Sequence, residues 1–378
     1  MTKRIALVYD CIYPYTKGGG EKRYYEIAKR LAIKGHEVHL YGMKFWEGQD
    51  VLQKEGLYLH GICPPKPLYT KDGRRSIRQA VFFGIHCLKL IKENFDIIDC
   101  CSFPYFSLFT CKFVCLLKGK KLHSTWHEVW GKKYWRSYLG VLGYIASSIE
   151  KFSVFLPDKI ISVSEHTTKK LKNDLSSKKD IITVLDGVDV DYIQKIKPSP
   201  VKSDVIFAGR LLSHKNVDVL IKSIAILKKS HRNVKCFIIG DGPERTRLEK
   251  MVATLHLTRN VVFLGFLENH DEVYSLIKSS KVSVLPSSRE GFGMVLVEAN
   301  ACGIPVITVK NKDNAAKDLI EEIKNGYVCR LGEKEIAEKI IKIVKNNTNE
   351  EMRQRCLDSA MKYDWNEIVN KIEKVYQE

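Results

Sequence analysis

The sequence predicts an α/β protein with two doubly wound parallel sheets that face each other across a cleft. Short apolar segments typical of buried strands alternate with amphipathic segments typical of helices over nearly all 378 residues. The alternation runs in two series, which a polar stretch with two prolines, 195–203, separates. The chain is also longer than one hydrophobic core usually supports, so two domains are expected.

The predicted domain boundary lies in this polar stretch, which has the composition of an interdomain linker. We expect an N-terminal domain over residues 1–198 and a C-terminal domain over residues 199–364. The final segment, about 365–378, has the periodicity of an amphipathic helix and is a candidate to pack back on the N-terminal domain.

The first series opens with a strand over Arg4–Tyr9 that is apolar enough to be buried on both faces. A loop ending in Gly18, Gly19 and Gly20 then leads into an amphipathic helix over 21–35. Glycines at this point let the backbone approach a phosphate or a sugar closely. The spacing is not the G-x-G-x-x-G dinucleotide fingerprint, and a flexible loop explains the triplet equally well.

The remainder of the N-terminal series continues the alternation. Further strands are expected at 37–41, 95–100, 121–125, 159–163 and 181–185, and helices at 77–91, 105–117, 138–156 and 165–173. The segment 105–117 is too short to span a bilayer, so we expect a helix buried within the domain.

His127 comes just after the strand expected at 121–125. Open α/β sheets bind ligands beyond the carboxyl ends of their strands, and a histidine can transfer protons near neutral pH. The alternative is a structural histidine that hydrogen-bonds a neighbour.

Aromatic and basic residues are interleaved around His127. They are Trp126, Trp130, Tyr134, Trp135 and Tyr138, with Lys132, Lys133 and Arg136 between them. Next to an apolar helix, this mixture favours contact with a membrane interface. A nucleic-acid groove is the alternative, but no RNA-binding or helix-turn-helix signature accompanies the residues.

The net charge of +18 is concentrated in the N-terminal half, where residues 1–200 hold 33 Lys and Arg against 20 Asp and Glu. Such a surface attracts nucleic acid, an anionic membrane or an acidic substrate. A lysine-rich surface without a partner is the alternative. We expect an anionic membrane surface as the partner of the basic N-terminal domain, and no nucleic acid.

The 11 cysteines are scattered and no pair has C-x-x-C spacing, which supports neither a zinc site nor a disulfide framework. No basic leader with an apolar core precedes the first strand, so no secretion signal is expected. We therefore expect a reduced, cytoplasmic protein, peripheral on the cytoplasmic face of the membrane.

The second series repeats the first. Strands are expected at 204–208, 235–239, 261–264, 282–285 and 305–309, with helices at 217–229, 244–255, 271–279, 333–345 and 350–363. Arg210 and Lys215 lie in the loop after its first strand. A planar guanidinium and a compact ammonium are together suited to a diphosphate, although ordinary surface charges are the alternative.

The stretch from Arg289 to Val306, REGFGMVLVEANACGIPV, combines two carboxylates with a glycine turn and an apolar helix. A helix that begins near Gly293 places Glu298 in its second turn and offers free N–H groups to an anion. Glu290 lies before the turn. Two acids next to an anion-attracting helix end suit the hydroxyl groups of a ligand that also carries phosphate, such as a sugar nucleotide.

Taken together, these residues resemble the retaining glycosyltransferases of family 4, which have the GT-B fold of two Rossmann-like domains. The resemblance covers nearly the whole chain. Its motifs are GGGE at 18–21, His127, DGVD at 186–189, GRLLSHKN at 209–216, IIGDGP at 238–243, FLGFL at 263–267 and the E-x7-E pair Glu290 and Glu298.

The resemblance implies a role for each matching residue. Arg210 and Lys215 would bind the donor diphosphate, Glu298 the ribose hydroxyls and Glu290 the donor sugar, with His127 near the sugar and the acceptor. The remaining donor-binding residues would be Gly18, Gly19 and Gly20, then Gly240 and Leu267 at the base, and Gly291, Phe292, Gly293, Met294 and Val295 at the sugar and phosphate. No metal and no cofactor are implied, and the co-substrate would be a UDP- or GDP-linked sugar.

The sequence therefore predicts a metal-independent, retaining hexosyltransferase that acts on a glycan or lipid-linked acceptor at a membrane surface, in cell-surface glycan or glycolipid synthesis. One alternative is the same catalyst with a soluble acceptor. Another is a non-catalytic module that binds a nucleotide sugar or a membrane. A NAD-dependent dehydrogenase is disfavoured because the G-x-G-x-x-G spacing is missing.

Overall fold

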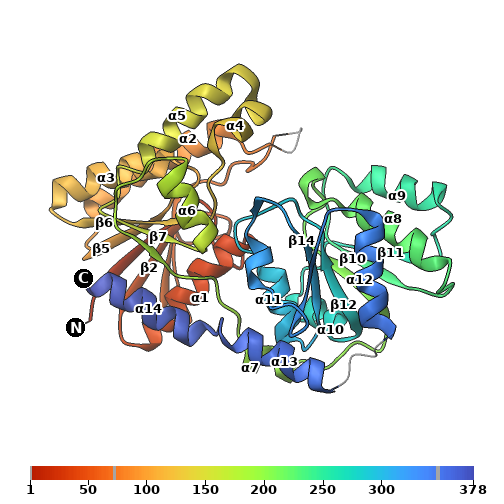
Figure 1. Cartoon of the computed structure of the whole chain (residues 1–378). Helices are drawn as coiled ribbons and strands as arrows, with labels where there is room; N and C mark the ends of the chain where they lie inside the picture. Colours follow the sequence, from red (N-terminus) through yellow and green to blue (C-terminus); the bar gives the residue numbers. More distant parts are fainter. Residues whose placement is uncertain (1, 71–73, 346–349) are drawn as a thin grey trace. The chain divides into compact units, whose positions relative to one another are not determined.

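The computed structural model describes residues 2–70, 74–345 and 350–378, which form two compact units (Figure 1). The first unit comprises the chain up to Asp186 together with Trp365–Glu378. The second comprises Gly187–Asp364. Each unit is a mostly parallel sheet covered by helices.

The first unit is built around a sheet with the strand order β3-β4-β2-β1-β5-β6-β7-β8. All neighbours pair in parallel except β3 and β4, which pair antiparallel at the edge. The strands are Arg4–Val8 (β1), Glu37–Met43 (β2), Val51–Lys54 (β3), Leu57–Cys63 (β4), Ile97–Cys101 (β5), Lys121–Trp126 (β6), Lys159–Ser162 (β7) and Ile181–Thr183 (β8). The chain order reverses between β1 and β5.

Helices cover both faces of this sheet. They are Gly19–Ile33 (α1), Ile77–His86 (α2), Cys87–Lys92 (η1), Phe106–Lys118 (α3), Gly131–Leu139 (α4), Gly140–Leu142 (η2), Gly143–Ser153 (α5), Glu165–Asn173 (α6) and Trp365–Gln377 (α14). One hydrophobic cluster joins α2, η1, α3, α4, α5 and α6 to one face. Side chains alternate along a strand, so the residues between those of the cluster point to the other face, where α1 and α14 pack together (Figure 1).

The carboxylate of Asp99 joins α1 and α14 to the sheet. Asp99 is 1% exposed and accepts hydrogen bonds from the hydroxyls of Tyr24 on α1, Thr125 on β6 and Tyr376 on α14. Burial raises the pKa of this carboxyl, which the three hydroxyl donors partly offset. The C-terminal helix is thus held on the first unit by a buried polar contact as well as by its apolar side chains.

The second unit has a parallel sheet in the order β11-β10-β9-β12-β14-β16, with a small ladder of β13 and β15 beside it. The strands are Ser203–Ala208 (β9), Cys236–Ile239 (β10), Val261–Gly265 (β11), Ser280–Leu285 (β12), Arg289–Glu290 (β13), Val306–Val309 (β14), Asp313–Asn314 (β15) and Gly326–Cys329 (β16). The helices are Val190–Lys195 (α7), Ser213–Lys215 (η3), Val217–Lys228 (α8), Arg245–Thr254 (α9), His270–Lys278 (α10), Met294–Ala301 (α11), Ala315–Leu319 (η4), Glu333–Lys345 (α12) and Glu350–Met361 (α13).

The unit boundary falls earlier than the predicted linker at 195–203. It lies between Asp186 and Gly187, because the chain from there on already packs on the second unit. The backbone N–H of Val188 donates to the carbonyl of Tyr363, and the ammonium of Lys278 donates to the carbonyls of Gln194 and Ile196. Proline and polar composition predicted a linker, but these hydrogen bonds tie the segment to the second unit.

The long helix predicted at 138–156 is interrupted: the range contains the end of α4, the short turn η2 and the whole of α5. Gly140 has a φ of +61°, a left-handed conformation that favours glycine. At Gly143 a Cβ atom would lie 2.2 Å from the carbonyl oxygen of Trp135, so only glycine allows the two helices to approach here. Apolar periodicity alone did not reveal this turn.

No helix in the described part of the chain is long and apolar enough to cross a membrane.

His123 makes the stability of the first unit dependent on pH. Its side chain lies on β6, 1% exposed, and its ring centroid is 5.8 Å from that of Tyr376. Burial, and then the charges of Lys159 and Lys121, lower its pKa to about 4. The unfolded chain, with a histidine pKa of about 6.5, therefore binds more protons between these two values, and folding stability falls as the pH falls through this window.

We expect His123 to contribute a loss of about 2 kcal/mol of unfolding free energy between pH 6.5 and pH 5. Urea denaturation of the wild type and of His123→Gln across this pH range measures the contribution of His123 to the unfolding free energy. The variant should have the shallower dependence on pH. Equal slopes for both proteins would contradict the assignment.

Candidate functional site

The predicted cationic and acidic residues of the second unit lie on the segments that follow the two central strands of its sheet. The strands β9 and β12 are neighbours there, and the chain order reverses between them. Open α/β sheets bind ligands beyond the carboxyl ends of the strands at such a point. Arg210 and Lys215 follow β9, whereas Glu290 and Glu298 follow β12.

Lys215 and Glu290 form an ion pair. The Lys215 Nζ lies 2.6 Å from the Glu290 Oε1, and the two side chains are only 16% and 13% exposed. Glu290 lies on β13, which pairs with β15 and so holds its backbone in place. The structure thus brings together two predicted site residues that are 75 positions apart in the chain.

The loops that carry Lys215 and Glu290 are also joined through the backbone. The carbonyl of His214 accepts a hydrogen bond from the backbone N–H of Ser288, and the side-chain amide of Asn216 donates to the carbonyl of Pro286. Asn216 has a φ of +51°, and its side chain makes no hydrogen bond to cap α8. The amide joins the two loops instead.

His214 lies in a positive electrostatic field. Burial, followed by the charges of Arg289, Lys215 and Arg210, lowers its pKa to about 3, so this imidazole is neutral at physiological pH. Three cations therefore lie near this imidazole beside β9, and one of them, Lys215, is paired with Glu290. An anion such as a diphosphate suits this position.

Glu298 lies in the second turn of α11, as the sequence predicts, and is 6% exposed. Its Oε1 accepts hydrogen bonds from the hydroxyl of Tyr274 at 3.0 Å and from the Nε2 of His270 at 3.2 Å. Both partners come from α10. The sequence does not identify them, because nothing in the pattern of α10 distinguishes them from ordinary helix residues.

The glycines of the second unit allow the site loops to approach one another. A Cβ on Gly240, whose φ is +121°, would lie 2.0 Å from the carbonyl oxygen of Gly209. A Cβ on Gly293, whose φ is +106°, would lie 2.5 Å from the Cβ of Ala316. Gly293 is the N-cap of α11. These positions require glycine for close packing, whatever ligand is bound.

The other predicted donor residues of this unit differ in orientation. Phe292 is buried and its ring packs edge-on against Tyr363, with centroids 5.8 Å apart, so only its backbone is available to a ligand. Met294 and Val295, at the start of α11, are half-buried, as are Gly291 and, after β11, Leu267.

In the first unit the structure brings the glycine turn next to His127. Gly18 is the N-cap of α1, and Gly19 and Gly20 are its first residues. A Cβ on Gly20 would lie 3.5 Å from the His127 Nε2, which is buried and has no hydrogen-bond partner among the described residues. Burial, more than any charge, lowers the His127 pKa. A ring nitrogen of a neutral imidazole can accept a hydrogen bond from a substrate hydroxyl or donate one to it, depending on the tautomer.

A buried polar cluster at the carboxyl end of β1 is not among the features predicted from the sequence. Asp10 is fully buried, and its Oδ2 accepts hydrogen bonds from the guanidinium of Arg75 and, at 2.8 Å, from the side-chain amide of Gln79. An acid directly after a buried strand could have been flagged from the sequence. Its partners could not, because they come from a distant part of the chain.

DGVD at 186–189 also has a structural role in the first unit. Arg23 on α1 is 1% exposed, and its guanidinium donates to the carboxylate of Asp186 at 2.6 Å and to the carbonyl of Val184 at 2.9 Å. Asp186 therefore fixes the end of the first unit to α1.

No group of three or more His, Cys, Asp or Glu in the described ranges is arranged to hold a metal ion. The predicted residues divide between the units, with Gly18, Gly19, Gly20 and His127 in the first and the others in the second.

Two family models match the chain in succession. The model described as Glycosyltransferase Family 4 matches residues 17–192, and that described as Glycosyl transferases group 1 matches residues 191–363. Together they extend over both units and include every predicted site residue.

Two curated relatives align over nearly the full chain. The gpi3 subunit of phosphatidylinositol N-acetylglucosaminyltransferase from Schizosaccharomyces pombe is 25% identical over 385 residues, covering 98% of this chain and 79% of that protein. The N-acetyl-alpha-D-glucosaminyl L-malate synthase of Bacillus anthracis is 25% identical over 397 residues, covering 96% and 94%. The chain also resembles the solved structure of Anabaena HepE in complex with UDP and glucose, with a TM-score of 0.72, 16% identity and full coverage of both chains. At that identity the likeness shows the fold.

Replacing Gly293 should destabilise the second unit. In Gly293→Ala the left-handed backbone alone costs about 1–2 kcal/mol, and the contact with Ala316 adds to it. We expect a loss of at least about 2 kcal/mol in equilibrium denaturation. Gly332→Ala is the matched control, because a Cβ there would meet only the Cγ of Glu335 at an ordinary 3.9 Å. Similar losses in both variants would contradict this explanation.

Proposed function

This chain belongs to glycosyltransferase family 4 and has its GT-B fold, and from this premise we propose that it is a retaining, metal-independent hexosyltransferase that uses a nucleotide-diphosphate sugar. The observation that carries the proposal is the Lys215–Glu290 ion pair within a cluster of cations at the reversal point of the second sheet. The UDP bound to HepE and the sugar-transfer names of both relatives support it.

Arg210 and Lys215 would bind the donor diphosphate, together with the N-terminus of α11. As the bond to the sugar breaks, negative charge develops on the leaving phosphate, and fixed cations and a helix dipole stabilise that charge. The two side chains thereby supply positive charge that a divalent metal supplies in other transferases. The UDP- or GDP-linked sugar is then a co-substrate, and no cofactor is needed.

Glu290 would orient the donor sugar rather than transfer a proton. In the free protein its carboxylate is held 2.6 Å from Lys215, which preorganises both groups. When the Lys215 ammonium pairs with a diphosphate instead, the Glu290 carboxylate can accept hydrogen bonds from sugar hydroxyls. Retention would then proceed by attack on the face of the leaving group, with the leaving phosphate accepting the acceptor's proton and His127 assisting.

Glu298 would bind the ribose hydroxyls. Its carboxylate is already oriented by Tyr274 and His270, so little ordering is needed when the nucleotide arrives. The base would lie near Gly240 and Leu267. Gly291, Gly293 and the backbone from Phe292 to Val295 would surround the sugar and phosphate, and Gly18, Gly19 and Gly20 would contribute from the first unit.

We place the acceptor hydroxyl on a lipid-linked or membrane-surface glycan, with the enzyme peripheral on the cytoplasmic face of the membrane. The basic N-terminal half and the phosphatidylinositol in the name of one relative support this. A soluble acceptor is the second candidate, favoured by the relative named for L-malate. Assays with a lipid extract and with its water-soluble fraction as acceptor separate the two.

Lys215→Ala and Glu290→Ala should each lower turnover at least a hundredfold, about 3 kcal/mol of barrier, because each removes a group that acts on the reacting centre. Single-turnover sugar transfer measures the effect, and thermal unfolding checks that the variants are folded. Lys222→Ala and Glu338→Ala replace exposed residues of α8 and α12 and serve as controls. Near-wild-type rates in either site variant would reject the assignment, as would a protein that binds donors without any transfer.

A nucleotide-sugar screen by thermal shift should identify the donor, since a ligand at 100 times its Kd stabilises a protein by roughly 2.7 kcal/mol. The preferred nucleoside diphosphate should bind less tightly when its ribose hydroxyls are removed. In Glu298→Ala this discrimination should disappear, whereas in Tyr274→Phe it should be reduced. If Glu298→Ala still binds the nucleoside diphosphate with ribose hydroxyls as preferentially as the wild type does, Glu298 does not bind the ribose.

A further inference from the structure

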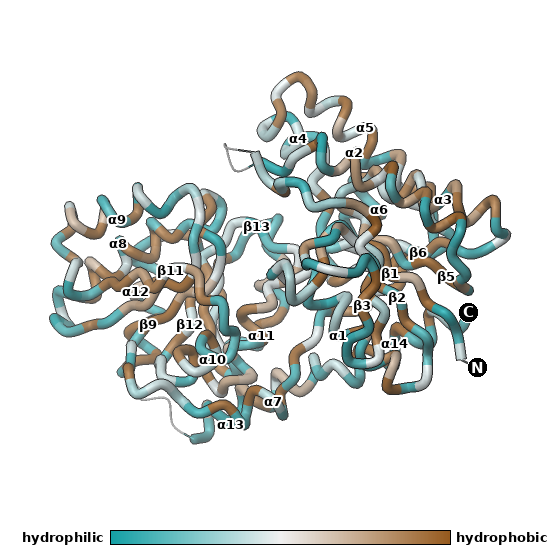
Figure 2. Tube along the Cα trace, turned by 180° about the vertical axis from the view of Figure 1, so that it is seen from behind, coloured by the Kyte–Doolittle hydropathy of each residue, from teal (hydrophilic) through white to brown (hydrophobic). Residues whose placement is uncertain are grey.

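An exposed apolar face lies on α3 and α5 of the first unit. We define it by Phe113 and Leu116 on α3 and by Val141, Leu142, Ile145 and Phe152 on η2 and α5. These residues are between 50% and 83% exposed, and exposed apolar residues that gather on one surface, unlike scattered ones, mark an interaction site. Phe109 of α3 stacks on Phe152 with centroids 5.9 Å apart, so the two helices adjoin. Figure 2 shows hydrophobic segments along both helices.

This face corrects two expectations from the sequence. The helix at 105–117 was expected to be buried, but only one side of α3 packs on the core. The tryptophans near His127 were expected at a membrane interface, but Trp126 is fully buried and Trp135 is 6% exposed. The exposed residues of the face are aliphatic side chains and phenylalanines at other positions of α3, η2 and α5.

The buried carboxylate of Glu150 explains why the aromatic residues point inward. It accepts hydrogen bonds from the backbone N–H groups of Trp130 and Gly131, at 2.7 and 2.8 Å, and from the Trp135 indole and the Tyr105 hydroxyl, both at 2.9 Å. These contacts hold α4 against α5 from inside. The opposite side of this helix pair remains outside the core.

The surroundings of the apolar face are basic. Residues 105–120 and 131–153 contain a single acid, Glu150, which is fully buried, and they expose Lys132, Lys133, Arg136 and Lys151. The carboxylate that contacts α3 from outside these ranges is that of Asp158, and it is paired with the Lys112 ammonium at 2.7 Å. Apolar side chains beside cations on amphipathic helices are the composition of interfacial membrane contacts.

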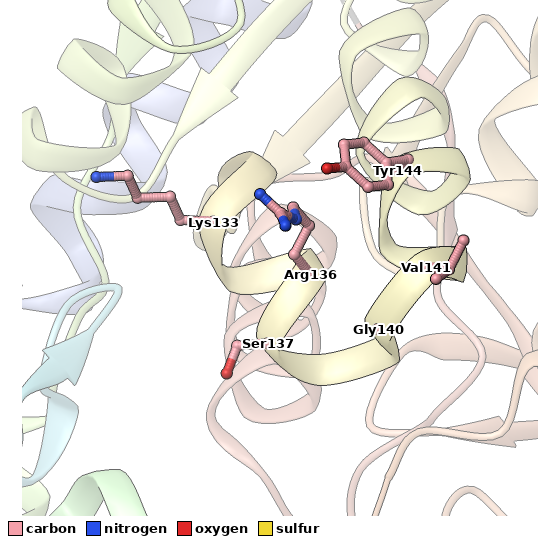
Figure 3. Close-up of a pocket in the computed structure, with 6 residues that line it drawn as sticks. All are labelled: Lys133, Arg136, Ser137, Gly140, Val141 and Tyr144. Carbon is pink, nitrogen blue, oxygen red and sulfur yellow. The ribbon is translucent and has the colours of Figure 1, made fainter.

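A hollow of about 470 Å³ joins the basic and apolar parts. Lys133, Arg136, Ser137, Gly140, Val141 and Tyr144 line it (Figure 3). The Arg136 guanidinium lies 4.9 Å from the centroid of the Tyr144 ring, and the Lys132 ammonium lies 5.3 Å from it. Val141 belongs both to this hollow and to the apolar face, so a phosphate held by the cations would have its acyl chains beside the apolar side chains.

We propose that the apolar face docks on an anionic phospholipid bilayer and that the hollow at Arg136 receives a lipid phosphate. Charge complementarity favours a bilayer over a protein partner, whose interface cores are depleted in lysine. This inference deepens the proposed membrane-surface acceptor. Flotation with vesicles reports binding without any sugar transfer, so it can fail independently of the proposed enzymatic activity.

The apolar contribution is tested by replacing Val141, Leu142 and Ile145 with serine and floating the full chain with vesicles of phosphatidylcholine and phosphatidylglycerol. We expect the partition coefficient to fall at least tenfold, because three exposed side chains lose their apolar contact. The matched control replaces Ile33, Val201 and Leu331, which are exposed elsewhere, with serine and should partition like the wild type. Equal flotation of both triple variants would overturn the proposal.

The basic contribution is tested by replacing Lys132, Lys133 and Arg136 with glutamine. Each cation near an anionic surface contributes about fivefold in binding, so a loss well above tenfold is expected, and high salt should weaken wild-type binding similarly. The control replaces the exposed Lys222, Lys250 and Lys371 with glutamine, which changes the net charge equally.

Either of two results would reject the membrane assignment. One is flotation that is the same with pure phosphatidylcholine and unaffected by salt. The other is no flotation, combined with a wild-type dimer that the Val141, Leu142 and Ile145 variant converts to a monomer. The second result would assign the face to a second copy of the chain. Unchanged thermal unfolding and unchanged donor binding confirm in each case that the variants are folded.

Discussion

Parallel strands leave a sheet in the same direction, and this constraint positions every candidate functional residue of the chain. Each crossover returns to the far end of the sheet, so the loops after the strands gather at one edge, and they separate only where the strand order reverses. In the second unit the reversal lies between β9 and β12, which places Lys215 next to Glu290. In the first unit it lies between β1 and β5, with Gly20 and His127 at the same edge.

Buried carboxylates determine much of how the helices of the first unit are arranged. Asp10, Asp99, Glu150 and Asp186 are all almost fully buried. Burying a charge costs several kcal/mol unless donors compensate it, and here the donors come from distant elements. Asp99 collects three hydroxyl donors and Glu150 four donors. Each carboxylate thus selects one arrangement of the helices around it.

Carboxylates have a different environment in the second unit. The Glu290 side chain is 13% exposed and its partner is the single cation Lys215, whereas Glu298 is nearly as buried as Asp186 and has its partners on α10. Lys215 can exchange a carboxylate for a diphosphate, because both are anions.

The helix pair α4–α5 has a buried carboxylate on its inner side and exposed cations on its outer side. Glu150 fixes its inner side, and residues 131–153 hold no other acid, so the charged side chains on its outer side are all basic. Because the inner polar groups are satisfied within the unit, the outer cations and apolar side chains are free to serve a surface contact. The membrane proposal follows from this division between the two sides.

The sequence by itself determined the α/β class, the repetition of two parallel sheets and the motifs that mark the edge of each sheet. These follow from local patterns: apolar runs for strands, helical periodicity, and Glu290 and Glu298 on either side of the turn at Gly293. The tertiary structure alone decided which distant residues are partners. Tyr274 and His270 at Glu298, and Arg75 and Gln79 at Asp10, are separated from them by tens of residues, and no local pattern encodes such pairings. It also decided the orientation of the residues around α4 and α5, because a buried carboxylate overrides the preference of tryptophan for an interface.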